Sequence, residues 1–123
     1  MRSIFLCIVL FMFVSCYEVE RNCKDYQIGT FKSEIKINDS IYTSEFIRTN
    51  NLQIETYNNK VDSSEVRWIN DCEVVFKTIN PKNRIERKDI HLKILTTTDS
   101  SYTFEYSYVG DKTKQKGIAK KID

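Results

Sequence analysis

From Gln27 to the end of the chain, apolar and polar residues alternate with a period of two. Phe31, Ile35 and Ile37 share one side of the first such segment, while lysine and glutamate residues occupy the other side. Successive side chains of a β-strand point to opposite faces, whereas a helix repeats about every 3.6 residues. The pattern therefore predicts a single all-β domain over residues 27–123.

Short polar segments divide this domain into about eight strands. Asn58–Asn59 predicts a tight hairpin, because asparagine adopts positive φ at low cost. Asn70–Asp71 predicts a second two-residue turn. The expected strands cover residues 27–37, 41–48, 52–57, 61–69, 72–77, 90–97, 102–108 and 112–122.

Strands of this length, joined by short turns, favour an antiparallel meander in chain order. The sheet would either close into a small lipocalin-like barrel or remain a half-open curled sheet. Closure pairs the edges that otherwise invite aggregation. Both forms agree with the alternation, and the lipocalin-like barrel is the favoured one.

The N-terminus has the layout of a secretory signal peptide. Arg2 precedes the apolar run 4–14, which is too short for a stable membrane span. A small residue, Ser15, follows the run and a cysteine follows Ser15. One interpretation is an ordinary signal peptide that is cleaved near Ser15.

The junction Phe13–Cys16 favours a second interpretation, because it resembles a bacterial lipobox. In that motif the cysteine is acylated and becomes the new N-terminus, and its acyl chains anchor the protein to a membrane. We therefore expect a lipoprotein signal peptide over 1–15, lipidation at Cys16 and a lipidated tether over 16–26. The implied location is the bacterial cell envelope, at the outer membrane bordering the periplasm, in either leaflet.

Removing residues 1–15 from the 123 leaves 108, which is enough for one small domain. Arg2 is the only charge removed, so 18 basic and 17 acidic residues remain. A chain this close to neutrality has no electrostatic reason to bind nucleic acid. We expect no nucleic-acid partner.

The four cysteines separate by position. Cys7 belongs to the signal peptide and Cys16 to the lipobox, which leaves Cys23 and Cys72 in an oxidising compartment. A Cys23–Cys72 disulfide would close a loop of about fifty residues and stabilise the fold by roughly 4 kcal/mol. A metal site and two free thiols are the alternatives.

Catalytic motifs are not recognisable in the sequence, and we expect no catalytic residue, metal or cofactor. The single histidine, His91, alternates with apolar residues and is expected to face solvent. Four carboxylates flank the expected Asn70–Asp71 turn without the ligand order of an EF-hand, so we interpret them as solvated turn residues. They are Asp62, Glu65, Asp71 and Glu73.

An aromatic row on one face of the seventh strand is the strongest candidate for a binding surface. It consists of Tyr102, Phe104, Tyr106 and Tyr108. These rings would either line a cavity for a small apolar ligand or fill the core together with Trp68. About 108 residues leave little room for a cavity, so core packing is the favoured interpretation.

Several stretches of the chain resemble a family of small lipoproteins from flavobacteria, a group of Bacteroidetes. They are Arg21–Asp25, Gly29–Phe31, Arg67–Glu73, Gln115–Gly117 and Lys120–Asp123.

Members of that family have no established activity, although some carry the label DNA topoisomerase IV. This chain has no ATP-binding motif and is far too short for the DNA gate of such an enzyme. The resemblance supports Cys23 and Cys72 as a structural pair and Trp68 as a core anchor. It implies no catalytic residue.

These observations predict a lipid-anchored envelope protein that acts as a non-enzymatic binding or interaction module. Its expected partners are the membrane, through the N-terminal lipid, and a small apolar ligand or another envelope protein. The competing class is a small envelope hydrolase. A pocket with buried polar residues, and above all His91 beside a carboxylate and a hydroxyl, would favour the hydrolase.

Overall fold

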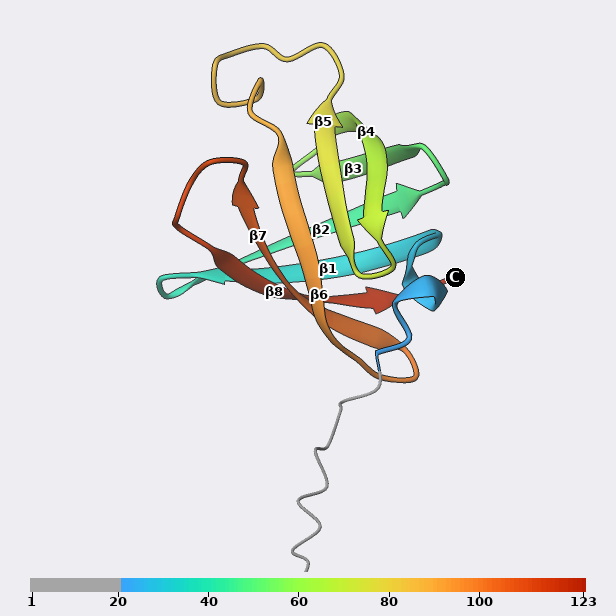
Figure 1. Ribbon diagram of the computed structural model, residues 1–123. Coiled ribbons are helices and arrows are strands. Elements are labelled where there is room, and N and C mark those ends of the chain that lie inside the picture. The colour runs from blue at the N-terminus through green and yellow to red at the C-terminus, as the bar shows by residue number, and fades with distance from the viewer. Residues whose placement is uncertain (1–20) are drawn as a thin grey trace, which may run out of the picture.

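Eight antiparallel strands, taken in chain order, form a closed barrel in the computed structural model of this protein (Figure 1). The structure describes residues 21–123. The expected signal peptide, Cys16 and the first part of the tether lie outside the described residues. The elements are η1 (Cys23–Tyr26), β1 (Gly29–Ile37), β2 (Ser40–Arg48), β3 (Leu52–Tyr57), β4 (Lys60–Asn70), β5 (Glu73–Thr78), β6 (Ile90–Thr97), β7 (Ser101–Tyr108) and β8 (Gln115–Lys121).

β1 pairs with β2 on one side and with β8 on the other, which closes the sheet. Ser33 lies at this seam, opposite Ser44 of β2 and Ala119 of β8. The predicted all-β meander is therefore confirmed, and of the two expected forms the closed barrel is the one observed. The fold class follows from the alternation, whereas closure depends on register.

The hairpin turns follow the asparagines of the sequence. Asn58 and Asn59 both have positive φ, 48° and 63°, as the predicted tight hairpin requires. The expected Asn70–Asp71 turn is displaced by one residue, because Asn70 pairs with Glu73 and remains in β4. A β-bulge between Trp68 and Asn70 shifts the register there.

The helix η1 covers one end of the barrel, and the disulfide Cys23–Cys72 ties it to the turn between β4 and β5. Cys23 and Tyr26 are both buried, and the hydroxyl of Tyr26 donates a hydrogen bond to the carbonyl of Thr98. The predicted disulfide is present, and it joins the first residues of the domain to the barrel wall. Among residues 21–123, no helix has the length and apolar character needed to cross a membrane.

The core fills the half of the barrel next to η1 and consists mainly of aromatic and branched side chains. Its buried members are Cys23, Tyr26, Phe31, Phe46, Val66, Val74, Phe76, Leu92, Ile94, Tyr102, Phe104 and Ala119. Trp68 is partly buried and packs against this cluster, so its expected role as a core anchor agrees with its position.

The third strand, β3, turns its polar side chains inward. Ile54 is exposed and lies opposite Ile47 on the outside of the barrel. Gln53 and Glu55 point inward, opposite Arg48 and Phe46 of β2. This part of the barrel therefore encloses polar groups, and a cavity accompanies them.

Candidate functional site

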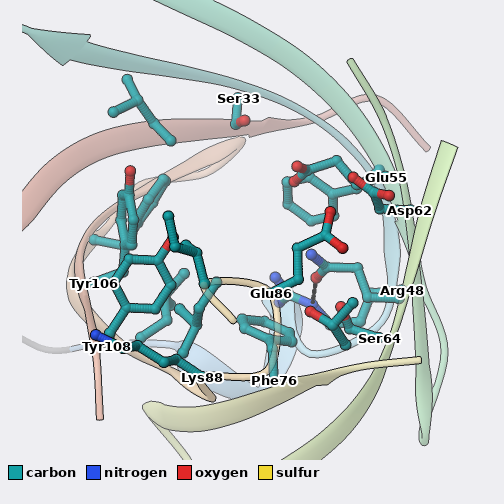
Figure 2. A pocket seen from close by; sticks show the side chains of 18 of the residues that line it. Ser33, Arg48, Glu55, Asp62, Ser64, Phe76, Glu86, Lys88, Tyr106 and Tyr108 are labelled. Atoms are coloured by element: carbon teal, nitrogen blue, oxygen red, sulfur yellow. Dashed lines mark hydrogen bonds between the residues drawn. The ribbon is translucent and has the colours of Figure 1, made fainter. Parts of the chain in front are cut away.

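A cavity of about 320 Å³ lies inside the barrel (Figure 2). The loop between β5 and β6 contributes Ile85, Glu86 and Lys88 to its lining, and this loop lies at the end of the barrel away from η1 (Figure 1). The cavity therefore has a base at the aromatic core and a mouth at the opposite end. Its volume is near the lower limit for pockets that hold small organic molecules.

Arg48 forms the base of the cavity, although its side chain is only 1% exposed. Its Nε donates to Oε1 of Gln53 at 2.9 Å, and its Nη1 donates to the carbonyl of Tyr26 at 3.0 Å. Its Nη2 donates to the hydroxyl of Tyr102 at 3.1 Å. Three of the guanidinium donors are thus engaged by protein groups.

Four aromatic rings surround the same guanidinium. The distances from its central carbon to the ring centroids lie between 5.0 and 5.5 Å for Phe31, Phe46, Trp68 and Phe76. Among the described residues, no carboxylate lies within 4.0 Å of a nitrogen of Arg48. Hydrogen bonds and ring faces, rather than an ion pair, hold this buried cation.

The aromatic row of β7 forms one wall of the cavity, since all four of its members line it. Tyr102 and Phe104 are also buried in the core, with ring centroids 5.7 Å apart. Phe104 and Tyr106 continue the row at 6.2 Å. The row therefore belongs partly to the core and partly to the cavity wall, and the prediction that the chain leaves little room for a cavity is wrong.

Space for this wall depends on Gly117 of β8, which pairs with Phe104. A Cβ atom at this position would lie 2.6 Å from Cζ of Phe104 and 2.8 Å from the carbonyl oxygen of Glu34. The missing side chain lets the tip of the Phe104 ring pack directly against β8.

Carboxylates form the wall that faces the aromatic row. Glu55 of β3 and Asp62 of β4 are directly paired across the two strands, and Glu86 extends from the loop between β5 and β6. Figure 2 shows Glu55 and Asp62 on one side of the cavity and Tyr106 and Tyr108 on the other.

Burial raises the pKa of Glu55 above its usual value, and the neighbouring charge of Asp62 raises it further. The positive charge of Arg48 partly offsets these two effects. Burial also raises the pKa of the Tyr106 hydroxyl, with further contributions from Tyr108 and Glu55. The interior of the cavity thus disfavours added negative charge.

The mouth carries one lysine, which has partners within the protein. Lys88 Nζ lies 3.9 Å from Oδ2 of Asp111 and 5.8 Å from the centroid of the Tyr108 ring. Glu86 accepts a hydrogen bond of 2.6 Å from the backbone of Lys82 and donates from its own backbone to Asn83. These contacts organise the loop beside the cavity.

His91 lies on the outside of the barrel, as its place in the alternation predicts. Its Nε2 lies 3.3 Å from Oε1 of Glu73, and it does not line the cavity. The hydrogen bond from Asn70 is the main cause that lowers the pKa of Glu73 below its usual value, and His91 adds to it. The only histidine is therefore a surface partner of a carboxylate.

The four carboxylates flanking the expected turn do not converge. Asp62 faces the cavity, whereas Glu65 is exposed in the middle of β4 and Glu73 contacts His91. Within residues 21–123, no three histidine, cysteine, aspartate or glutamate side chains are grouped to hold a metal ion.

The polar half of the cavity was not predicted from the sequence. Gln53 and Glu55 belong to β3, where the apolar Leu52 and Ile54 favour the opposite inward face, whereas Arg48 and Asp62 share the inward faces of their strands with the apolar Phe46 and Val66. One signal was present, because pairing outward from the Asn58–Asn59 turn places Glu55 opposite Asp62.

The chain matches no protein-family model, no curated protein and no solved structure. The functional argument therefore depends on the cavity and the residues around it.

Proposed function

We propose that this chain is a lipid-anchored protein of the bacterial cell envelope whose barrel binds a small organic molecule without transforming it. The observation that carries the proposal is the cavity of about 320 Å³, with one aromatic wall and a few polar groups. Ligand pockets in proteins combine these same features.

The position of the cavity agrees with an anchored protein. Cys16 precedes Cys23 by seven residues, so even an extended chain spans only about 25 Å between them. Cys23 is held at the closed end of the barrel by its disulfide, and the mouth is at the other end. A lipid on Cys16 would thus keep the closed end near the bilayer, and the ligand would enter from the aqueous side.

The competing function, a small hydrolase, has one observation in its favour. The cavity contains hydroxyls and carboxylates, and Glu55 has a raised pKa of the kind that general acids show. Two observations count against a hydrolase. His91 lies outside the cavity, and the hydroxyl of Ser33 is hydrogen-bonded to the hydroxyl of Ser44 at 2.7 Å rather than to a catalytic base. Binding remains the better account of the geometry.

A plugged cavity tests the binding function. Ser64 of β4 lines the cavity, whereas the neighbouring Ser63 does not. We expect Ser64→Trp to fill the space and Ser63→Trp to leave it open. The assay is a thermal-shift screen of the wild type and both variants against a panel of small amphiphiles of each charge type.

Compounds that bind the cavity raise the melting temperature of the wild type and of Ser63→Trp, but not of Ser64→Trp. Circular dichroism checks that Ser64→Trp is folded. Tyr106→Ala, which enlarges the cavity, is a second variant and should prefer larger ligands than the wild type does. The proposal is contradicted if no compound stabilises the wild type. It is also contradicted if the compounds that stabilise the wild type stabilise Ser64→Trp equally.

A further inference from the structure

We propose that the cavity selects a cationic ligand, namely an organic amine or quaternary ammonium with a compact apolar body. The cationic group lies beside Glu55 and Asp62, and the body lies against the Tyr106 side of the cavity. This inference rests on the proposed binding function and specifies the chemistry of its ligand.

The first argument is the pairing of two acids. Glu55 and Asp62 are direct cross-strand partners, an arrangement that is unfavourable for like charges. Among the described residues, no basic nitrogen lies within 4.0 Å of either carboxylate, and neither carboxylate accepts a side-chain hydrogen bond that the structure shows. Asp62 is exposed to solvent whereas Glu55 is partly buried, so a ligand cation would remove this repulsion and supply Glu55 with the partner that it lacks.

The second argument is that the two nearby protein cations are already occupied. Arg48 donates three hydrogen bonds and is surrounded by four aromatic rings at the buried base. Lys88 lies over Tyr108 and near Asp111 at the mouth. Arg48 only partly offsets the charge of Glu55, and neither cation lies within 4.0 Å of either carboxylate, so the pair is available to a ligand.

The third argument is the wall opposite the acids. Phe104, Tyr106 and Tyr108 present ring faces and hydroxyls to the same space. Aromatic faces pack against apolar bodies and also attract ammonium groups, so this wall suits the body of the ligand and favours its positive charge. The volume of about 320 Å³ limits the body to about one fused ring system.

An anionic ligand fits the cavity less well. To reach Arg48 it would have to enter a cavity whose lining also includes the carboxylates Glu55, Asp62 and Glu86. At the base it would meet a guanidinium that is 1% exposed and already hydrogen-bonded. The arrangement therefore discriminates against a negatively charged ligand.

Three indole compounds of matched shape test the inference. Tryptamine carries an ammonium group, tryptophol a hydroxyl and indole-3-propionate a carboxylate on the same ring system. Isothermal titration near neutral pH measures the affinity of each for the wild type. We expect tryptamine to bind about tenfold more tightly than tryptophol, a difference of ~1.4 kcal/mol, and indole-3-propionate to bind most weakly.

A double variant locates the effect. Glu55→Gln with Asp62→Asn removes both charges, and we expect it to bind tryptamine and tryptophol alike. The matched control is Glu45→Gln with Glu65→Gln, which removes two charges from the exposed outer face of β2 and β4 and should keep the wild-type preference.

Equal binding of tryptamine and tryptophol by the wild type would overturn the cationic preference and leave the binding function intact. Tightest binding of indole-3-propionate would overturn it in favour of an anion. Failure of all three compounds to bind would also overturn the inference, and the thermal-shift panel with Ser64→Trp would then judge the binding function separately.

Discussion

The guanidinium of Arg48 and the hydroxyl of Tyr102 are joined by a hydrogen bond of 3.1 Å at the base of the cavity. Both side chains are at most 1% exposed. The bond links the end of β2 to the start of β7, strands that are not neighbours in the barrel. It connects two separate parts of the barrel wall beneath the cavity. Losing this hydrogen bond would be costly, because the charge of Arg48 is buried.

Tyr102→Phe removes this acceptor while keeping the ring. We expect the free energy of unfolding to fall by about 1–3 kcal/mol, because one donor of a buried cation is left without a partner. Urea denaturation measures the change. Tyr42→Phe, at an exposed position, is the control and should unfold like the wild type. Equal stability of both variants would show that the Arg48–Tyr102 bond contributes nothing.

The acidic pair makes stability depend on pH. The folded-state pKa of Glu55 is raised, so the folded protein holds this proton more tightly than the unfolded chain does. Ionisation of Glu55 therefore destabilises the folded protein. This destabilisation is absent well below the ordinary pKa of 4.5, grows as the pH rises from that value to the raised pKa, and is complete above the raised pKa. Glu55→Gln should therefore be more stable than the wild type at neutral pH.

Thermal melts across the acidic range check this prediction. The advantage of Glu55→Gln should shrink as the pH falls from the raised pKa through 4.5 and vanish well below 4.5, whereas Glu45→Gln on the outer face should show no such trend. An advantage of Glu55→Gln that stays constant over the whole range would mean that titration of this carboxyl is not its source.

The disulfide is expected to stabilise the closed end of the barrel. Cys23→Ser or Cys72→Ser should lower the free energy of unfolding by a few kcal/mol, up to roughly 4, and release η1 from the turn between β4 and β5. Denaturation of each variant measures the loss, and adding reductant to the wild type should reproduce it. A wild type that is insensitive to reductant would argue against a stabilising bridge.

The membrane anchor depends on Cys16. Metabolic labelling with a fatty-acid analogue should mark the wild type, and Cys16→Ser should lose both the label and its retention in the membrane fraction. Cys7→Ser is the matched control, because this cysteine lies within the expected signal peptide and should leave labelling unchanged. Labelling that survives Cys16→Ser would exclude the lipobox.

The number and order of strands could be predicted because their signal is local. Alternation and turn residues act within a few positions of one another, and Asn58–Asn59 places its hairpin within one residue. The Asn70–Asp71 turn was displaced because a bulge near Trp68 is a property of the paired strands. Local pattern does not contain that information.

The acidic wall could not be predicted because alternation divides a strand into two faces without saying which face is inside. In β3 the apolar Ile54 is outside and Glu55 is inside. The polar side chain can face inward there because it borders the cavity and not the packed core. The burial of Arg48 is equally non-local, because its partners Tyr26 and Tyr102 lie 22 and 54 residues away.

The central claim, that the interior of the barrel is a ligand site, is tested most directly by the methyl resonances of isoleucine. Ile35, Ile85 and Ile90 line the cavity, Ile85 from the exposed loop between β5 and β6, whereas Ile47 and Ile54 are exposed on the outer face of the barrel. Titration of the isoleucine-methyl-labelled protein with tryptophol, which is neutral, should shift the three cavity methyls and leave the two outer ones unchanged. Shifts confined to the outer methyls, or none at all, would contradict the account.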